Sequence, residues 1–131
     1  MAYFEWKNVY SVDNSKIDQQ HRNLFDIANR FHSAFEEERS HDELEKIFSE
    51  LMEYTRFHFR DEEELMLKHE YPDLEQHKEK HGQLLELVLR LQKEFDAGKI
   101  GVEVEIVRFL KTCLSGHILG VDTRYRAYVN V

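Results

Sequence analysis

Four amphipathic segments constrain the fold of this chain more than any other feature of its sequence. In each of them apolar side chains recur every three or four residues, which is the period of one face of an α-helix. Ser40, three residues before Glu43, forms a capping box ahead of the second segment, Pro72 ends it, and Gly98 suits a helix C-cap after the third. The sequence therefore predicts an all-α fold with helices at about residues 18–38, 41–69, 74–96 and 102–120.

Short connections between these helices predict their arrangement. Helices joined by a few residues pack as antiparallel neighbours, so we expect an up-down-up-down four-helix bundle. Residues 1–16 have no clean helical period but carry aromatic side chains, including Trp6 and Tyr10. We interpret them as an extended N-terminal arm that packs on the bundle. At 131 residues, the chain 1–131 is expected to form a single domain.

Composition and charge exclude several classes of protein. Hydrophobic residues make up 41% and charged residues 34%, as in an ordinary globular domain. The net charge of −8 without a basic cluster argues against nucleic acid or an anionic membrane surface as a partner. No apolar run is long enough for membrane insertion. The single cysteine, Cys113, excludes an internal disulfide, and the N-terminal residues lack a signal-peptide pattern, so we expect a cytoplasmic protein.

Polar residues interrupt the apolar stripes at one level of the predicted bundle. Six polar residues, five histidines and one glutamate, lie on these stripes. Each of them alone could be a core residue whose hydrogen bonds are satisfied, or could lie at the core boundary. Together, five imidazoles and a carboxylate cannot all find neutral partners cheaply. A metal ion satisfies them, binding one ring nitrogen of each histidine while other groups hold the second. The predicted metal-binding set is His21, His58, Glu62, His77, His81 and His117.

Asp122 requires a separate argument. It lies five residues after His117, which on a regular helix is well off the same face. It joins the site if the helix widens or ends there, and Gly116 and Gly120 would permit such a distortion. The alternative is an N-cap or surface aspartate, and spacing does not decide between them. The remaining histidines, at 32, 41 and 69, are not aligned with the layer and are expected outside the site.

The motifs Ile17-Asp18-Gln19-Gln20-His21, His58-xxx-Glu62, His77-xxx-His81 and His117-xxxx-Asp122 resemble those of the hemerythrin family, and closely those of single-domain bacteriohemerythrins. The resemblance covers nearly the whole chain. It implies a non-haem site of two iron ions per chain with an oxo or hydroxo bridge, which binds O2 reversibly. By this resemblance, His77, His81 and His117 would bind one iron and His21 and His58 the other, with Glu62 and Asp122 bridging both.

This resemblance implies an oxygen carrier or store rather than an enzyme, with an O2-consuming enzyme as a candidate recipient. The imidazole-rich donor set should favour diferrous over high-valent iron, which suits reversible binding. Three alternatives stay open: an O2 or redox sensor, a peroxidase-like or ferroxidase di-iron enzyme, and a protein that handles iron or nitric oxide. A sensor usually needs a fused output domain, for which this chain has no room. We expect a monomer, because one bundle accounts for the apolar stripes.

The same resemblance places Cys113, Leu114 and Ile118 along the O2 pocket, with Cys113 where the family often has tryptophan. A smaller side chain would leave a looser pocket and speed autoxidation. We therefore expect Cys113→Trp to slow conversion of the oxygenated protein to the oxidised (met) form, followed by its absorption spectrum. An unchanged rate would indicate that Cys113 packs as an ordinary small hydrophobic residue, the alternative that the sequence leaves equally open.

Overall fold

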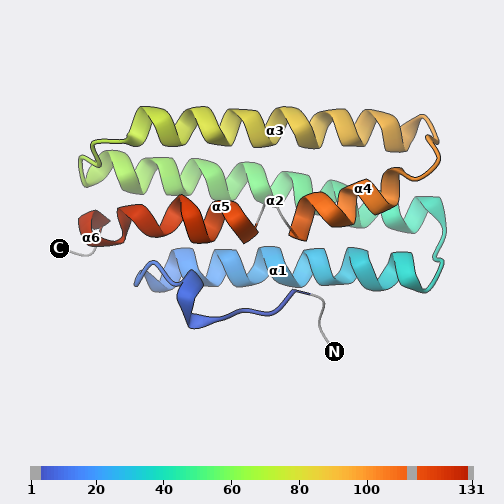
Figure 1. Ribbon diagram of the computed structural model, residues 1–131, viewed down its shortest axis with the longest axis horizontal. Coiled ribbons are helices and arrows are strands. Elements are labelled where there is room, and N and C mark those ends of the chain that lie inside the picture. Colours follow the sequence, from blue (N-terminus) through green and yellow to red (C-terminus); the bar gives the residue numbers. More distant parts are fainter. Residues whose placement is uncertain (1–3, 112–114, 130–131) are drawn as a thin grey trace.

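Three long helices and a fourth column of two shorter ones form the bundle in the computed structural model, which describes residues 4–111 and 115–129. The long helices are α1 (Ser15–Glu36), α2 (His41–Lys68) and α3 (Leu74–Asp96), and the fourth column contains α4 (Val102–Phe109) and α5 (Ser115–Gly120) (Figure 1). Short helical turns complete the described chain: η1 (Asn8–Tyr10), η3 (Asp122–Tyr125) and α6 (Arg126–Val129). No strand occurs in these residues, which confirms the predicted all-α bundle.

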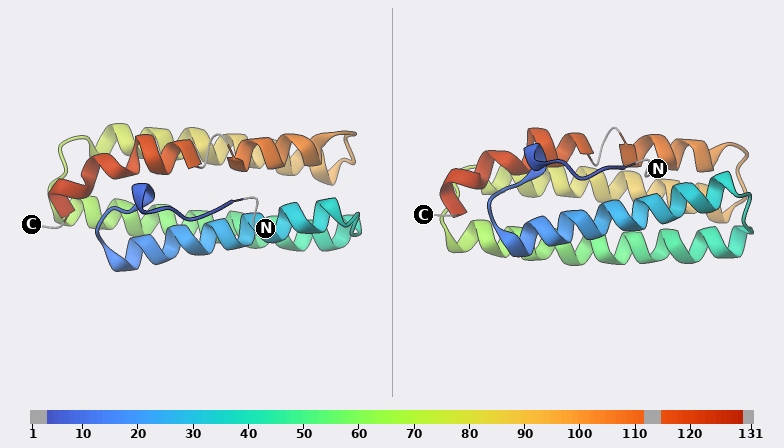
Figure 2. Two further views of the ribbon diagram at one scale, coloured as in Figure 1. Left: turned by 60° about the horizontal axis from the view of Figure 1, so that its bottom comes forward. Right: turned by 90° about the horizontal axis from the view of Figure 1, so that it is seen from below.

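The helices pack as two layers of two. Figure 2 shows α1 beside α2 in one layer, and α3 beside the α4–α5 column in the other. Neighbouring columns run in opposite directions, as the short connections predict. Within the described parts of the chain, no helix is both long and apolar enough to cross a membrane.

Local interactions explain where the helices begin and end. The first helix begins at Ser15, ahead of the expected residue 18, because the Asn14 side chain accepts a hydrogen bond from the Ile17 amide at 3.1 Å. Ser40 caps α2 by accepting from the Glu43 amide at 3.2 Å. The expected continuous helix 102–120 is interrupted: α4 ends at Phe109, and the next two residues, 110 and 111, are π-helical.

The N-terminal arm runs alongside α1 (Figure 2). The Phe4 amide donates to Asn29 Oδ1 at 2.7 Å, and Asn29 Nδ2 donates to the Phe4 carbonyl at 2.8 Å. The rings of Trp6 and Tyr10 lie 5.9 Å and 5.3 Å from that of Phe25. The arm is thereby fastened over the segment of α1 that also carries His21.

The apolar core consists of two clusters separated by a polar layer. Along α1, Ile17 belongs to the smaller cluster and Leu24 to the larger, with His21 between them. Along α2, Leu51 and Met52 belong to the larger cluster and Met66 to the smaller one, with His58 and Glu62 between them. The polar residues therefore lie between two apolar regions that shield them from solvent.

The C-terminal end of α1 adopts a left-handed backbone at a residue that is not glycine, and this leads to a prediction about stability. Glu38, with φ of 55°, follows α1, and the Arg39 amide bonds the Ala34 carbonyl at 2.9 Å, as in a Schellman motif. Such a backbone costs an L-residue roughly 1 kcal/mol or more, partly offset by the greater unfolded-state entropy of glycine. We expect Glu38→Gly to raise the free energy of unfolding by about 0.5–1 kcal/mol in denaturant titrations. The control Glu37→Gly, at φ of −82°, should lower it instead.

Candidate metal centre

Seven buried side chains from all four columns meet in the polar layer. They are His21 from α1, His58 and Glu62 from α2, His77 and His81 from α3, His117 from α5 and Asp122 from η3. None is more than 7% exposed. The structure thus brings together every residue of the predicted set. Whether they bind metal is a matter of their geometry and chemistry.

Asp122 reaches the layer because α5 ends before it. The Val121 amide still bonds the His117 carbonyl at 2.8 Å, but α5 ends at Gly120 and η3 begins at Asp122. This change of direction returns Asp122 to the side of the helix that carries His117. Asp122 Oδ1 lies 2.9 Å from Nε2 of both His117 and His77. Of the two readings that spacing left open, the structure therefore supports the one in which Asp122 joins the histidines.

In both Glu62 and Asp122, each of the two carboxylate oxygens lies close to a histidine nitrogen. Glu62 Oε1 lies 2.9 Å from His81 Nε2 and 3.1 Å from His77 Nε2, while Oε2 lies 3.4 Å from His58 Nε2. Asp122 Oδ2 lies 3.1 Å from His21 Nε2. The donor atoms form two overlapping groups that share Glu62 and Asp122, each group spanning no more than 4.8 Å.

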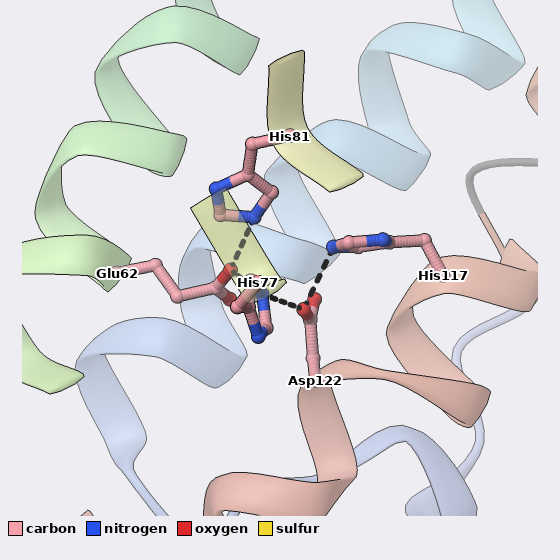
Figure 3. A group of neighbouring side chains, drawn as sticks. All are labelled: Glu62, His77, His81, His117 and Asp122. Carbon is pink, nitrogen blue, oxygen red and sulfur yellow. Dashed lines mark hydrogen bonds and ion pairs between the residues drawn. The ribbon is translucent and has the colours of Figure 1, made fainter. Parts of the chain in front are cut away.

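We call these groups the three-histidine position (His77, His81 and His117) and the two-histidine position (His21 and His58). Figure 3 shows the three-histidine position, where the imidazoles and both carboxylates point toward one another from different elements. The shared carboxylates would allow two ions to be held side by side.

Several of these atoms are close together yet form no hydrogen bond. Within the described residues, Nε2 of His21, His81 and His117 and both oxygens of Asp122 are buried without a hydrogen-bonding partner, although nitrogen–oxygen distances are 2.9–3.1 Å. Two ligands at right angles and about 2.1 Å from one ion lie about 3 Å apart, so this spacing fits donors that face a common ion. Imidazole and carboxylate donors suit iron among other transition metals. The residues therefore fit a metal pair.

Without metal, the layer balances its charge with protons. Burial would raise the pKa of Glu62, but His58, His21 and His77 outweigh it and hold that pKa well below its usual range. Burial and the Glu62 charge act in the same direction on Asp122, but His117 and His21 keep its pKa below the usual value. Conversely, burial would lower the pKa of His21 and His77, but Asp122 and Glu62 raise both to about 9. The metal-free site thus holds protons that a cation would replace.

Other side chains hold the predicted ligands in place. The Tyr125 hydroxyl donates to Glu62 Oε2 at 2.7 Å, and the ring of Phe59 stacks on His81 at 3.8 Å between centroids. Nδ1 of His58 hydrogen-bonds Gln20, and Nδ1 of His81 hydrogen-bonds Glu63, both at 2.7 Å.

Sequence reasoning did not assign roles to these supporting residues. Gln20 could have been found, because it lies three residues after Ile17 and four before Leu24, on an apolar stripe. Tyr125, three residues after Asp122, carried only a weak signal as part of an aromatic tail. Glu63 had no signal, since it resembles any charged residue of a helix surface.

The other predicted residues lie as follows. Ile118 is 1% exposed and belongs to the larger apolar cluster. Cys113 and Leu114, predicted to line the same pocket, lie outside the described residues. The three remaining histidines, at 32, 41 and 69, are outside the layer, as expected; His41 forms a group with Glu45 and Asp96 on the exposed surface.

A helical bundle with a core layer of five histidines and two carboxylates is a candidate metal-binding bundle. The family described as "Hemerythrin HHE cation binding domain" matches residues 12–129, and the chain belongs to the hemerythrin family. It is 38% identical to a bacteriohemerythrin of Methylococcus capsulatus, over 95% of each chain, and 34% identical to one of Clostridium acetobutylicum, over 93% of this chain and 98% of that one. A wild-type hemerythrin crystal structure superposes with a TM-score of 0.91 at 30% identity, covering 99% of this chain and 100% of that chain.

The raised histidine pKa values predict how the stability of the metal-free protein depends on pH. A group whose pKa rises from 6.5 to about 9 on folding stabilises the folded state fully below pH 6.5. That contribution is lost as pH rises toward 9. We expect the free energy of unfolding, from denaturant titrations, to fall by a few kcal/mol, as an order of magnitude, between pH 6.5 and 9.5.

Two variants separate this effect from general alkaline destabilisation. His77→Gln removes one of the two groups and should flatten the slope, whereas His69→Gln, outside the layer, should leave it unchanged. Unfolding free energy that stays constant or rises over this pH range would contradict the charge balance inferred for the layer.

Proposed function

We propose that this protein binds O2 reversibly at a pair of iron ions and acts as an oxygen carrier or store. The observation that carries the proposal is the pair of overlapping donor groups, rich in imidazole and sharing two buried carboxylates. Membership of the hemerythrin family supports iron as the metal and O2 as the ligand. Iron, when bound, would supply the electrons that reversible O2 binding requires.

The residues would divide between the ions as the two positions indicate. His77, His81 and His117 would hold one iron, and His21 and His58 the other. Glu62 and Asp122 would contribute oxygens to both, along with an oxo or hydroxo bridge. The two-histidine position has one protein donor fewer, so it is the position we expect to accept O2.

The residues around the site would exclude water from bound O2 and keep the ligands oriented. Ile118 and Phe59 place apolar surface beside the layer, and both are nearly fully buried. Tyr125, itself fully buried, holds its proton because burial and the charges of Glu62 and Asp122 raise its pKa well above the usual value. Its hydroxyl therefore remains a donor to Glu62 at physiological pH and keeps that carboxylate oriented.

The donor set favours a carrier over an oxidising enzyme. Di-iron bundles of the ferritin-like type use a carboxylate-rich set of glutamates with two histidines. Here five neutral donors and two carboxylates provide less negative charge to stabilise high-valent iron. We infer a monomer in the cytoplasm that delivers O2 to an O2-consuming enzyme. A sensor role for the same site is the second candidate. A carrier must return to its reduced state when O2 is removed, and irreversible oxidation would favour the sensor.

The test is to load the protein with Fe2+ without oxygen, measure iron per chain, and record absorption spectra after aeration and again after O2 removal. We expect about two irons per chain and a charge-transfer band that appears with O2 and disappears without it. Asp122→Asn, which keeps the shape of a shared ligand, should abolish this cycle. Asp26→Asn, the same change at an exposed position, should not.

Two other results would change the conclusion. Two irons that oxidise irreversibly would contradict a carrier and favour the enzyme or sensor alternatives. A folded protein that takes up no iron would contradict the metal site itself.

A further inference from the structure

The two metal positions differ in the groups that support their histidines. His81 and His58 both turn Nε2 toward Glu62, at 2.9 Å and 3.4 Å, and each forms a hydrogen bond through Nδ1 on the other side of the ring. Both acceptors are oxygen atoms, so Nδ1 is the donor in both contacts and Nε2 is the ring nitrogen that faces the site. The difference lies in the charge of the acceptor.

His81 bonds a carboxylate. Nδ1 of His81 lies 2.7 Å from Glu63 Oε2, and the neighbouring Glu62 faces the opposite side of the ring. The imidazole is also restrained by Phe59, whose ring is nearly parallel to it at an interplanar angle of 4°. A carboxylate at Nδ1–H increases the basicity of Nε2 and fixes the orientation of the ring.

His58 bonds a neutral amide. Gln20 Oε1 lies 2.7 Å from His58 Nδ1, and Gln20 Nε2 donates to Asp61 Oδ2 at 2.8 Å, which settles which end of the amide is oxygen. Asp61 in turn lies 3.4 Å from the ammonium of Lys16. The Asp61 carboxylate is therefore linked to His58 only through the Gln20 amide, and it is paired with a cation.

His21, the second histidine of the same position, has still less support. Its Nδ1 is buried and has no hydrogen-bond partner within the described residues. Neither histidine of the two-histidine position thus bonds a carboxylate through Nδ1, whereas the three-histidine position has one that does and has an additional imidazole.

We propose that Glu63 is a positioning residue that makes the three-histidine position the first to bind a divalent ion, and that Gln20 leaves the two-histidine position the second. The inference rests on the two-metal site of the proposed function and assigns its order of filling. On loss of metal, the two-histidine position empties first. The pair would then pass through a state with one ion held by His77, His81 and His117.

The order of filling is measured on the wild-type protein with Zn2+, a diamagnetic probe. Metal-free protein labelled with 15N at histidine is titrated and followed by NMR. We expect the first equivalent to shift the Nε2 signals of His77, His81 and His117, and the second those of His21 and His58. A first equivalent that shifts the signals of His21 and His58, or of all five equally, would overturn the proposal.

The roles of the supporting residues are measured by calorimetric titration of variants with Zn2+. We expect Glu63→Gln to weaken the tighter step by about 10–100-fold and leave the weaker step nearly unchanged. Glu64→Gln makes the same change at the adjacent exposed position and should alter neither step. Gln20→Glu should tighten the weaker step. Equal effects of Glu63→Gln and Glu64→Gln, or of Glu63→Gln on both steps, would contradict a role through His81.

These results are separable from the test of the proposed function. Ordered filling with no reversible O2 band would contradict the carrier and leave this inference standing. A reversible O2 band with filling in the opposite order would overturn this inference and leave the carrier standing.

Discussion

The charge of two carboxylates in the middle of the core is the constraint on which the rest of this structure depends. Glu62 and Asp122 are both 0% exposed, and a buried ionised carboxylate is costly unless other groups compensate it. Five imidazoles surround them, and Tyr125 donates a hydrogen bond to one. Compensation must come from protons on the histidines or from bound cations, and the close approach of nitrogen and oxygen atoms that form no hydrogen bond fits cations.

This constraint links the site to the stability of the bundle. The donors come from α1, α2, α3, α5 and η3, so an ion in the layer would join every column of the fold. The apolar clusters on both sides exclude water, which strengthens each electrostatic interaction within the layer. They also make the layer harder to satisfy in the absence of metal. Metal binding and folding are therefore expected to be coupled in this protein.

In the proposed two-metal site, the supporting contacts would make the two positions unlike although both use the same ligand type. Imidazole is the common donor, but its second nitrogen meets a carboxylate in one case and an amide in another. Because Glu63 and Gln20 each lie next to a predicted ligand in the chain, the helices that position the ligands also position the residues that differentiate them.

The sequence by itself predicted the all-α bundle and the family, and it predicted the layer in two ways: periodicity gave six of its seven members, and the family resemblance added Asp122. Helical periodicity encodes which side of each helix is buried, so polar residues on the apolar stripes, such as His58 and Glu62, could be recognised without coordinates. The short connections also predicted that both would lie at one level with His21 and His77. The membership of the family followed from the order and spacing of these residues and was confirmed by comparison.

Only the tertiary structure decided the rest, because it depends on where helices end and how they are rotated against one another. Periodicity assumes a regular helix, and Asp122 enters the layer because α5 stops at Gly120. The hydrogen bonds of Tyr125 to Glu62 and of Gln20 to His58 join residues 63 and 38 positions apart. Such contacts require a particular packing of separate helices, and no local pattern in the sequence carries that information.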